Sequence, residues 1–75
     1  MKLSDLKLHQ SAIILSVKMI NTKAKIRLLE MGMTPGTLIT VTKKAPLGDP
    51  LGIALRGYEL CISEKEASYI FVETI

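Results

Sequence analysis

His9 and Cys61 are the two side chains of this 75-residue chain that could act as a base and a nucleophile. The sequence offers no third residue to orient the histidine, and so short a chain leaves little room for a deep cleft. Glu64 and Glu66 flank one turn, but Glu66 is needed as a helix cap, and the histidine and cysteine show no metal-ligand spacing. We therefore expect a protein that is not an enzyme, with no catalytic residue, no cofactor and no metal ligand. A weak transition-metal site shared across a dimer contact stays an open alternative.

Charge is distributed unevenly along the chain. Residues 1–45 carry a net charge of +6 and residues 46–75 a net charge of −3, which together give the overall +3. Such asymmetry suits an acidic partner that meets one side of the molecule, although a solvated surface is the simpler explanation. Aromatic residues make up 4% of the chain and none lies in the basic segment. Because single-strand binders stack bases on aromatic rings, we expect no nucleic-acid partner.

The sequence also indicates a compartment. A single cysteine excludes an internal disulfide framework and fits a reducing, cytoplasmic setting. Lys2 is followed by Ser4 and Asp5 where a signal peptide would need an apolar run. The longest apolar run covers residues 12–15, far too short to cross a bilayer. We expect a cytoplasmic protein that meets a membrane only indirectly, through a partner.

Alternating apolar residues and turn signals predict a mainly β domain over residues 1–75. The expected elements are a helical turn at 4–7 capped by Ser4, a helix at 22–31, and strands at 12–20, 38–45, 51–56, 58–62 and 71–73. Ser63 and Glu66 form a capping box that opens a further single turn, which buries Ala67 and Ile70. Five short strands cannot bury a core as a flat sheet, so we expect a small SH3-like antiparallel barrel with one α-helix.

Two glycines predict the path of the chain after the helix. Gly32 suits the left-handed position that closes a helix, which sets Met33 against Leu28 in a Schellman motif. Pro35 and Gly36 then occupy the central positions of a type II turn, because glycine takes a positive φ without steric cost. These residues should turn the chain sharply into the second strand.

The helix at 22–31 carries two apolar stripes, whereas a helix lying on a small barrel needs one. The stripe assigned to the core consists of Ala24, Leu28 and Met31. The second stripe lies roughly opposite and consists of Ile26 and Leu29, flanked by Lys23 and Lys25. Apolar anchors ringed by lysines are typical of a docking surface, and we interpret the second stripe so, with two harmless exposed side chains as the alternative. Arg27 lies beside the core stripe, where it could brace the Pro35-Gly36 turn or the barrel.

Three segments together resemble one protein family. They are residues 27–36 (RLLEMGMTPG), residues 45–50 (APLGDP), and residues 60–63 (LCIS) ahead of Glu66-Ala67. In order and spacing they are similar to the bacterial ferrous iron transport protein A (FeoA) family. His9-Gln10, in place of a frequent glycine, and Cys61 and Ser63, in place of a small apolar residue and an arginine, depart from the family pattern.

The resemblance implies a stand-alone cytoplasmic SH3-like domain that assists the ferrous iron permease FeoB. A similar domain ends some iron-dependent repressors, but no DNA-binding helical domain stands beside this one. The implied partner is the cytoplasmic GTPase region of the permease, with a weak homo-oligomer as a further expectation. If the second stripe is not the contact, docking moves to the 46–50 loop, where Leu47 and Asp49 are the candidates. The alternative function is a homo-oligomeric or metal-responsive regulatory domain that acts away from the permease.

Overall fold

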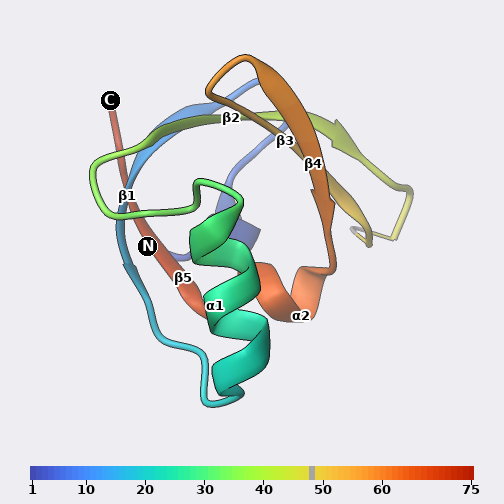
Figure 1. The fold of residues 1–75 in the computed structure, drawn as a ribbon. Helices are drawn as coiled ribbons and strands as arrows, with labels where there is room; N and C mark the ends of the chain where they lie inside the picture. Colours follow the sequence, from blue (N-terminus) through green and yellow to red (C-terminus); the bar gives the residue numbers. More distant parts are fainter. Residues whose placement is uncertain (48) are drawn as a thin grey trace.

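The computed structural model describes residues 1–47 and 49–75, so Gly48 of the expected 46–50 loop lies outside the described residues. The elements follow one another along the chain as Figure 1 shows. They are a 3-10 turn η1 (Leu3–Asp5), β1 (Ser11–Val17), α1 (Thr22–Glu30), β2 (Leu38–Lys44), β3 (Leu51–Leu55), β4 (Tyr58–Ile62), α2 (Glu64–Ala67) and β5 (Ile70–Thr74).

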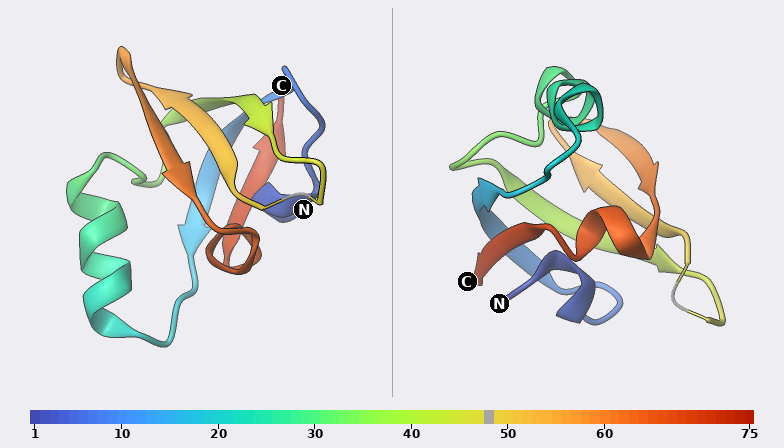
Figure 2. Two further views of the ribbon diagram at one scale, coloured as in Figure 1. Left: turned by 90° about the vertical axis from the view of Figure 1, so that its right-hand side faces the viewer. Right: turned by 90° about the horizontal axis from the view of Figure 1, so that it is seen from below.

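The five strands form one antiparallel sheet in the order β4-β3-β2-β1-β5. Register shifts between Ile14 and Ser16 in β1 and between Val41 and Lys43 in β2 mark irregularities that bend and twist a strand. The sheet curls round on itself, as the two views in Figure 2 show. η1 contacts both α2 and β5. This curled sheet with one longer helix confirms the predicted mainly β, SH3-like fold.

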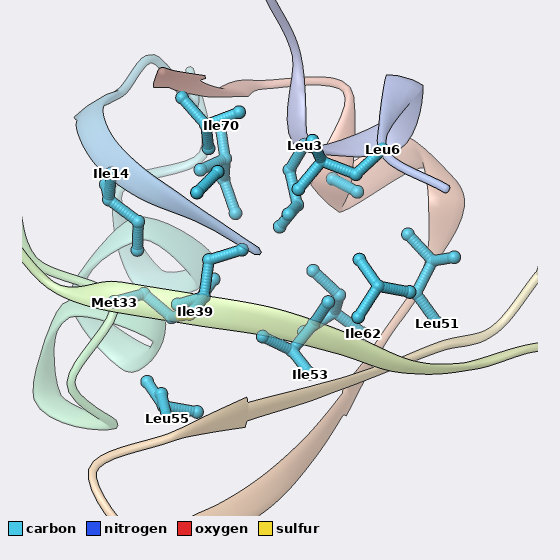
Figure 3. Close-up of a cluster of buried hydrophobic side chains, with 14 of the residues drawn as sticks. Leu3, Leu6, Ile14, Met33, Ile39, Leu51, Ile53, Leu55, Ile62 and Ile70 are labelled. Carbon is cyan, nitrogen blue, oxygen red and sulfur yellow. The ribbon is translucent and has the colours of Figure 1, made fainter. Parts of the chain in front are cut away.

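The core is aliphatic, as the low aromatic content requires. Alternation along β2 buries Ile39 and Val41, while Thr40 and Thr42 between them stay partly accessible on the other face. Figure 3 shows the cluster that the strands enclose. Its largest fully buried members are Leu3, Leu6, Ile14, Leu28, Met33, Ile39, Leu51, Ile53, Ile62, Ile70, Val41 and Val72.

α1 joins this core through its C-terminal end. Leu28 is the buried residue of the helix, and it belongs to the core cluster together with Met33. Met33 N–H donates to the Leu28 carbonyl at 3.0 Å, and Gly32 N–H donates to the Leu29 carbonyl at 3.1 Å. With Gly32 at φ 101°, this is the predicted Schellman motif. At the other end, Asn21 Oδ1 accepts from Ala24 N–H at 3.1 Å and caps the helix.

The turn after α1 also has its predicted form. Gly36 has φ 90°, and Thr37 N–H donates to the Thr34 carbonyl at 3.1 Å. Arg56 Nη2 donates to Thr34 Oγ1 at 3.2 Å and to Thr37 Oγ1 at 3.0 Å. Arg56, rather than Arg27, therefore braces this turn.

Two expected elements differ by more than one residue at an end. The first turn covers Leu3–Asp5, and Asp5 Oδ2 accepts from Lys2 N–H at 3.0 Å, so Ser4 lies inside the turn and is not its cap. The first strand ends at Val17 and not at residue 20, because the chain leaves the sheet there to reach α1. The capping box is confirmed: Ser63 Oγ accepts from Glu66 N–H at 3.0 Å, and Ser63 N–H donates to Glu66 Oε1 at 3.1 Å.

Leu28→Ala tests the attachment of α1 to the core. Truncation of this fully buried side chain should lower the free energy of unfolding by about 2–5 kcal/mol, as large-to-small core changes do. Ile26→Ala is the matched control, because Ile26 is 49% exposed on the same helix, and it should change the free energy of unfolding little. Urea unfolding of both variants gives the comparison, and equal effects would contradict the assigned phase of the helix.

Gly32→Ala and Gly36→Ala separate backbone strain from crowding. Both glycines have positive φ, so alanine should cost about 1–2 kcal/mol at either position. At Gly32 an added Cβ would also lie 3.0 Å from Arg56 Cδ and 3.3 Å from Leu55 Cδ1, whereas at Gly36 it meets nothing within 4 Å. Gly32→Ala should therefore destabilise more in urea unfolding, and equal losses would show that the Arg56 side chain gives way freely.

Candidate functional site

The outer face of α1 presents the predicted docking residues. Ile26 is 49% exposed and Lys23 is exposed, while Lys25 is half-buried. Leu29 was expected to be fully exposed, and this expectation is wrong: its side chain is partly buried and packs against the core cluster. The exposed apolar anchor of this face is therefore Ile26 alone, and Leu29 contributes mainly to the attachment of the helix.

A groove runs along one side of α1, between the helix, the end of β1 and the Pro35 turn. Its volume is about 510 Å³. Lys25 and Leu29 line it from α1, one helical turn apart, so both lie on the same side of the helix. The lining residues are Ser16, Val17, Lys18, Met19, Lys25, Leu29 and Pro35.

A second groove of about 550 Å³ runs along the other side of α1, toward α2. It is lined by Met19, Ile20, Asn21, Ala24, Lys65, Glu66 and Tyr69. Met19 lines both grooves, so α1 stands off the sheet with an accessible channel on each side. Figure 2 shows the helix and the connection before it projecting from the sheet. Ala24 and Met31, assigned to the core stripe, are only partly buried in this arrangement.

An ion pair joins the two helices across this second groove. Arg27 Nη2 lies 2.5 Å from Glu66 Oε2, with the arginine side chain 50% exposed. The other carboxylate oxygen, Glu66 Oε1, accepts from Ser63 N–H at 3.1 Å. One glutamate thus caps α2 and holds α1 at the same time.

The 46–50 loop offers less to a partner than the sequence suggested. Leu47 is 90% exposed, but Asp49 Oδ1 accepts from Glu64 N–H at 3.0 Å at the start of α2. Asp49 therefore has a role within the molecule, since an acidic acceptor suits a helix N-terminus.

His9 and Cys61, the candidates for catalytic and metal chemistry, lie apart in the structure. Cys61 is exposed on β4, His9 is exposed ahead of β1, and β2 and β3 lie between those strands. His9 has φ 69°, which explains why glycine suits this position. Within residues 1–47 and 49–75, no group of three or more His, Cys, Asp or Glu side chains could hold a metal ion. In the same described residues, no helix has the length and apolar character needed to span a membrane.

One surface feature escaped the sequence analysis, and a second was predicted only in part. Ile20 is 91% exposed between β1 and α1, where alternation predicted a strand. Arg56 has φ 48° beside Gly57 at φ 87°, a two-residue hairpin turn that the glycine alone only half indicates. Had the sequence analysis ended the first strand at Val17, it would have placed Ile20 in the connection to the helix and predicted its side chain to be exposed.

Comparison with known proteins gives the family. The sequence model of the FeoA domain matches residues 1–74. The chain belongs to the FeoA family. The family is involved in ferrous iron transport.

Three relatives illustrate the match. A fusion of Fe(2+) transport protein A with the Fe(2+) transporter FeoB, from Porphyromonas gingivalis (strain ATCC BAA-308 / W83), is 37% identical over 75 residues, which are 100% of this chain and 9% of that protein. The solution structure of FeoA from Chlorobium tepidum has a TM-score of 0.93 at 35% identity, over 100% of this chain and 70% of that one. The crystal structure of Stenotrophomonas maltophilia FeoA complexed with zinc, described as an SH3 domain protein, has a TM-score of 0.86 at 32% identity, over 97% of this chain and 89% of that one.

A manganese-dependent transcriptional repressor also superposes on this FeoA chain, with a TM-score of 0.89 at 9% identity over 100% of this chain and 41% of that one. At that identity the likeness shows the shared fold alone. It carries nothing about metal response or DNA binding in this chain.

Substitutions of Glu66 separate its two contacts. Glu66→Gln keeps an acceptor for Ser63 N–H but loses the charge facing Arg27, and should cost less than about 1 kcal/mol because that ion pair is partly solvated. Glu66→Ala loses the cap as well and should cost about 1 kcal/mol more. Urea unfolding at low and high salt measures both variants. Salt should shrink the ion-pair loss that the two variants share and leave the difference between them unchanged. Equal destabilisation by the two variants would contradict the capping role.

Proposed function

We propose that this chain is an accessory protein of bacterial ferrous iron uptake that binds the cytoplasmic GTPase region of a FeoB-type permease. In this proposal residues 1–75 act as one cytoplasmic domain without catalytic activity, and the domain meets the membrane only through the permease. The fusion relative supports it, because two activities joined in one polypeptide act at one place. The permease makes up most of that relative, so its partners and substrate enter here as a proposal.

The observation that carries the proposed contact is the exposed face of α1. Ile26 is exposed one helical turn from Lys23, on the same helix whose Lys25 and Leu29 line a groove. An apolar anchor over a groove, with cations at its rim, has the arrangement of an interface centre and its polar border. The lysines also favour an acidic surface on the partner and steer its approach.

Binding of this kind regulates through differential affinity. A ligand shifts a conformational equilibrium only by the difference in its affinity for the two states. The domain would therefore favour whichever nucleotide state of the permease fits the α1 face better. It needs no active site for this role, which agrees with the separation of His9 and Cys61.

Ile26→Asp tests the proposed contact against the purified soluble region of a FeoB-type permease. Binding is measured by isothermal titration without nucleotide, with GDP and with a non-hydrolysable GTP analogue. We expect wild type to bind with nucleotide-dependent affinity, and Ile26→Asp to keep its thermal melt but lose about tenfold or more in affinity. Leu29 is unsuitable for such a test because its side chain packs on the core.

Leu47→Asp is the control, since Leu47 is an even more exposed aliphatic residue and lies on the 46–50 loop. It should bind as wild type does. Loss of binding in Leu47→Asp with full binding in Ile26→Asp would move the contact to that loop. Absence of wild-type binding in all three nucleotide conditions would contradict the permease proposal itself.

A further inference from the structure

The two edge strands of the sheet differ in whether another segment of the chain pairs with their outer side. The outer edge of β5 is covered by the start of the chain, where Lys2 bridges to Phe71 and Val72 N–H donates to the Met1 carbonyl at 2.8 Å. At the opposite end of the sheet, β4 pairs with β3 and, among the described residues, with no other strand. An uncovered edge is a ready template for another strand.

The hairpin fixes which backbone groups of β4 face outward. Arg56 and Gly57 form a two-residue turn with positive φ at both positions, and they connect Leu55 to Tyr58 as a cross-strand pair. In such a hairpin the closing pair exchanges hydrogen bonds, and every second pair after it does the same. The N–H and C=O groups of the intervening residues therefore point away from β3. These residues are Glu59 and Cys61, and both are exposed.

β4 lacks the sequence features that protect an edge. It contains no lysine or proline, and its pairing with β3 runs without a register shift. Its one charged residue, Glu59, is directed over its own sheet: Oε2 accepts from Thr42 Oγ1 at 2.5 Å, and Oε1 lies 3.4 Å from Lys43 Nζ. The hydrogen bond from Thr42 and then the contact with Lys43 hold the pKa of this carboxyl below its usual value. The Glu59 carboxylate therefore makes its contacts on the face of the sheet and does not block the edge of β4.

We propose that β4 is a homodimer interface, in which two copies of this chain pair antiparallel, edge to edge, about a two-fold axis at Leu60. The register follows from the outward groups, because Glu59 of each copy must then stand opposite Cys61 of the other. A register with Glu59 opposite Glu59 sets like charges against each other. A register with Cys61 opposite Cys61 places Glu59 opposite Ser63. This register is less favourable because Ser63 lies beyond the end of β4.

A second copy satisfies this edge better than an unrelated strand because the edge is complementary to itself. About an axis at Leu60, the pair of Glu59 with Cys61 occurs twice, and Tyr58 of each copy stands at the register position of Ile62 of the other. The pairing uses residues of β4 and none of the α1 contact residues, so it goes beyond the proposed permease contact and does not depend on it.

Cys61→Pro tests the interface with little effect on the fold. Proline removes an N–H that points away from β3, so the intramolecular ladder should stay intact, as it does for prolines on edge strands. Analytical ultracentrifugation over a wide concentration range, with reductant present to exclude disulfides, should show a monomer–dimer equilibrium for wild type. Cys61→Pro should weaken it by about tenfold or more. Cys61→Ser, which keeps the N–H, is the control and should dimerise as wild type does.

Amide hydrogen exchange of the wild-type chain gives a test that needs no variant. The Glu59 and Cys61 amides should exchange rapidly in dilute solution and become protected as concentration rises, whereas the Leu60 amide should be protected throughout. A wild type that stays monomeric at all concentrations, unchanged exchange at Glu59 and Cys61, or a folded Cys61→Pro variant that dimerises as wild type does would each overturn the proposal. None of these outcomes involves the permease.

Discussion

The contact between Leu28 and Met33 is the interaction on which the shape of the molecule depends. It forms because Gly32 takes a left-handed conformation that L-residues with a Cβ rarely adopt, so that the chain doubles back over the last turn of α1. Both side chains then enter the core beneath the sheet. The turn at Gly36 continues the reversal and delivers the chain to β2. Without this contact α1 would have no fixed position, and neither groove beside it would exist.

The rest of α1 is held lightly, and this is what makes it available for binding. One ion pair, Arg27 with Glu66, connects it to α2, and its N-terminal half stands clear of the sheet between two grooves. A small domain has little stability to spare, so its exposed apolar side chains must be few and separated. Ile26 on the helix and Ile20 before it are two of the exposed apolar side chains that this chain carries.

Local signals in the sequence were sufficient wherever the structure depends on backbone geometry. Gly32, Gly36 and the pair Ser63 and Glu66 predicted their turns and cap correctly, because each signal needs only a few neighbouring residues. The long-range partners could not be predicted. The contact of Arg27 with Glu66, and those of Arg56 with Thr34 and Thr37, can be predicted only when the strand order is known. Leu29 was misplaced for a similar reason: an ideal helical wheel does not show that the end of β1 and Pro35 lie along that side of α1, where Leu29 packs against the core cluster.

The way β5 is flanked bears on how such a domain joins a larger protein. β1 occupies one side of this strand, residues Met1 and Lys2 occupy the other, and Ile75 leaves the sheet exposed. A polypeptide continuing from that end would displace no strand, so covalent linkage, as in the Porphyromonas gingivalis fusion, requires no change in the fold. Linkage raises the effective concentration of the domain at its target without any new contact. A domain on a separate chain lacks this gain in effective concentration, so its α1 face must bind the target with higher affinity to reach the same occupancy.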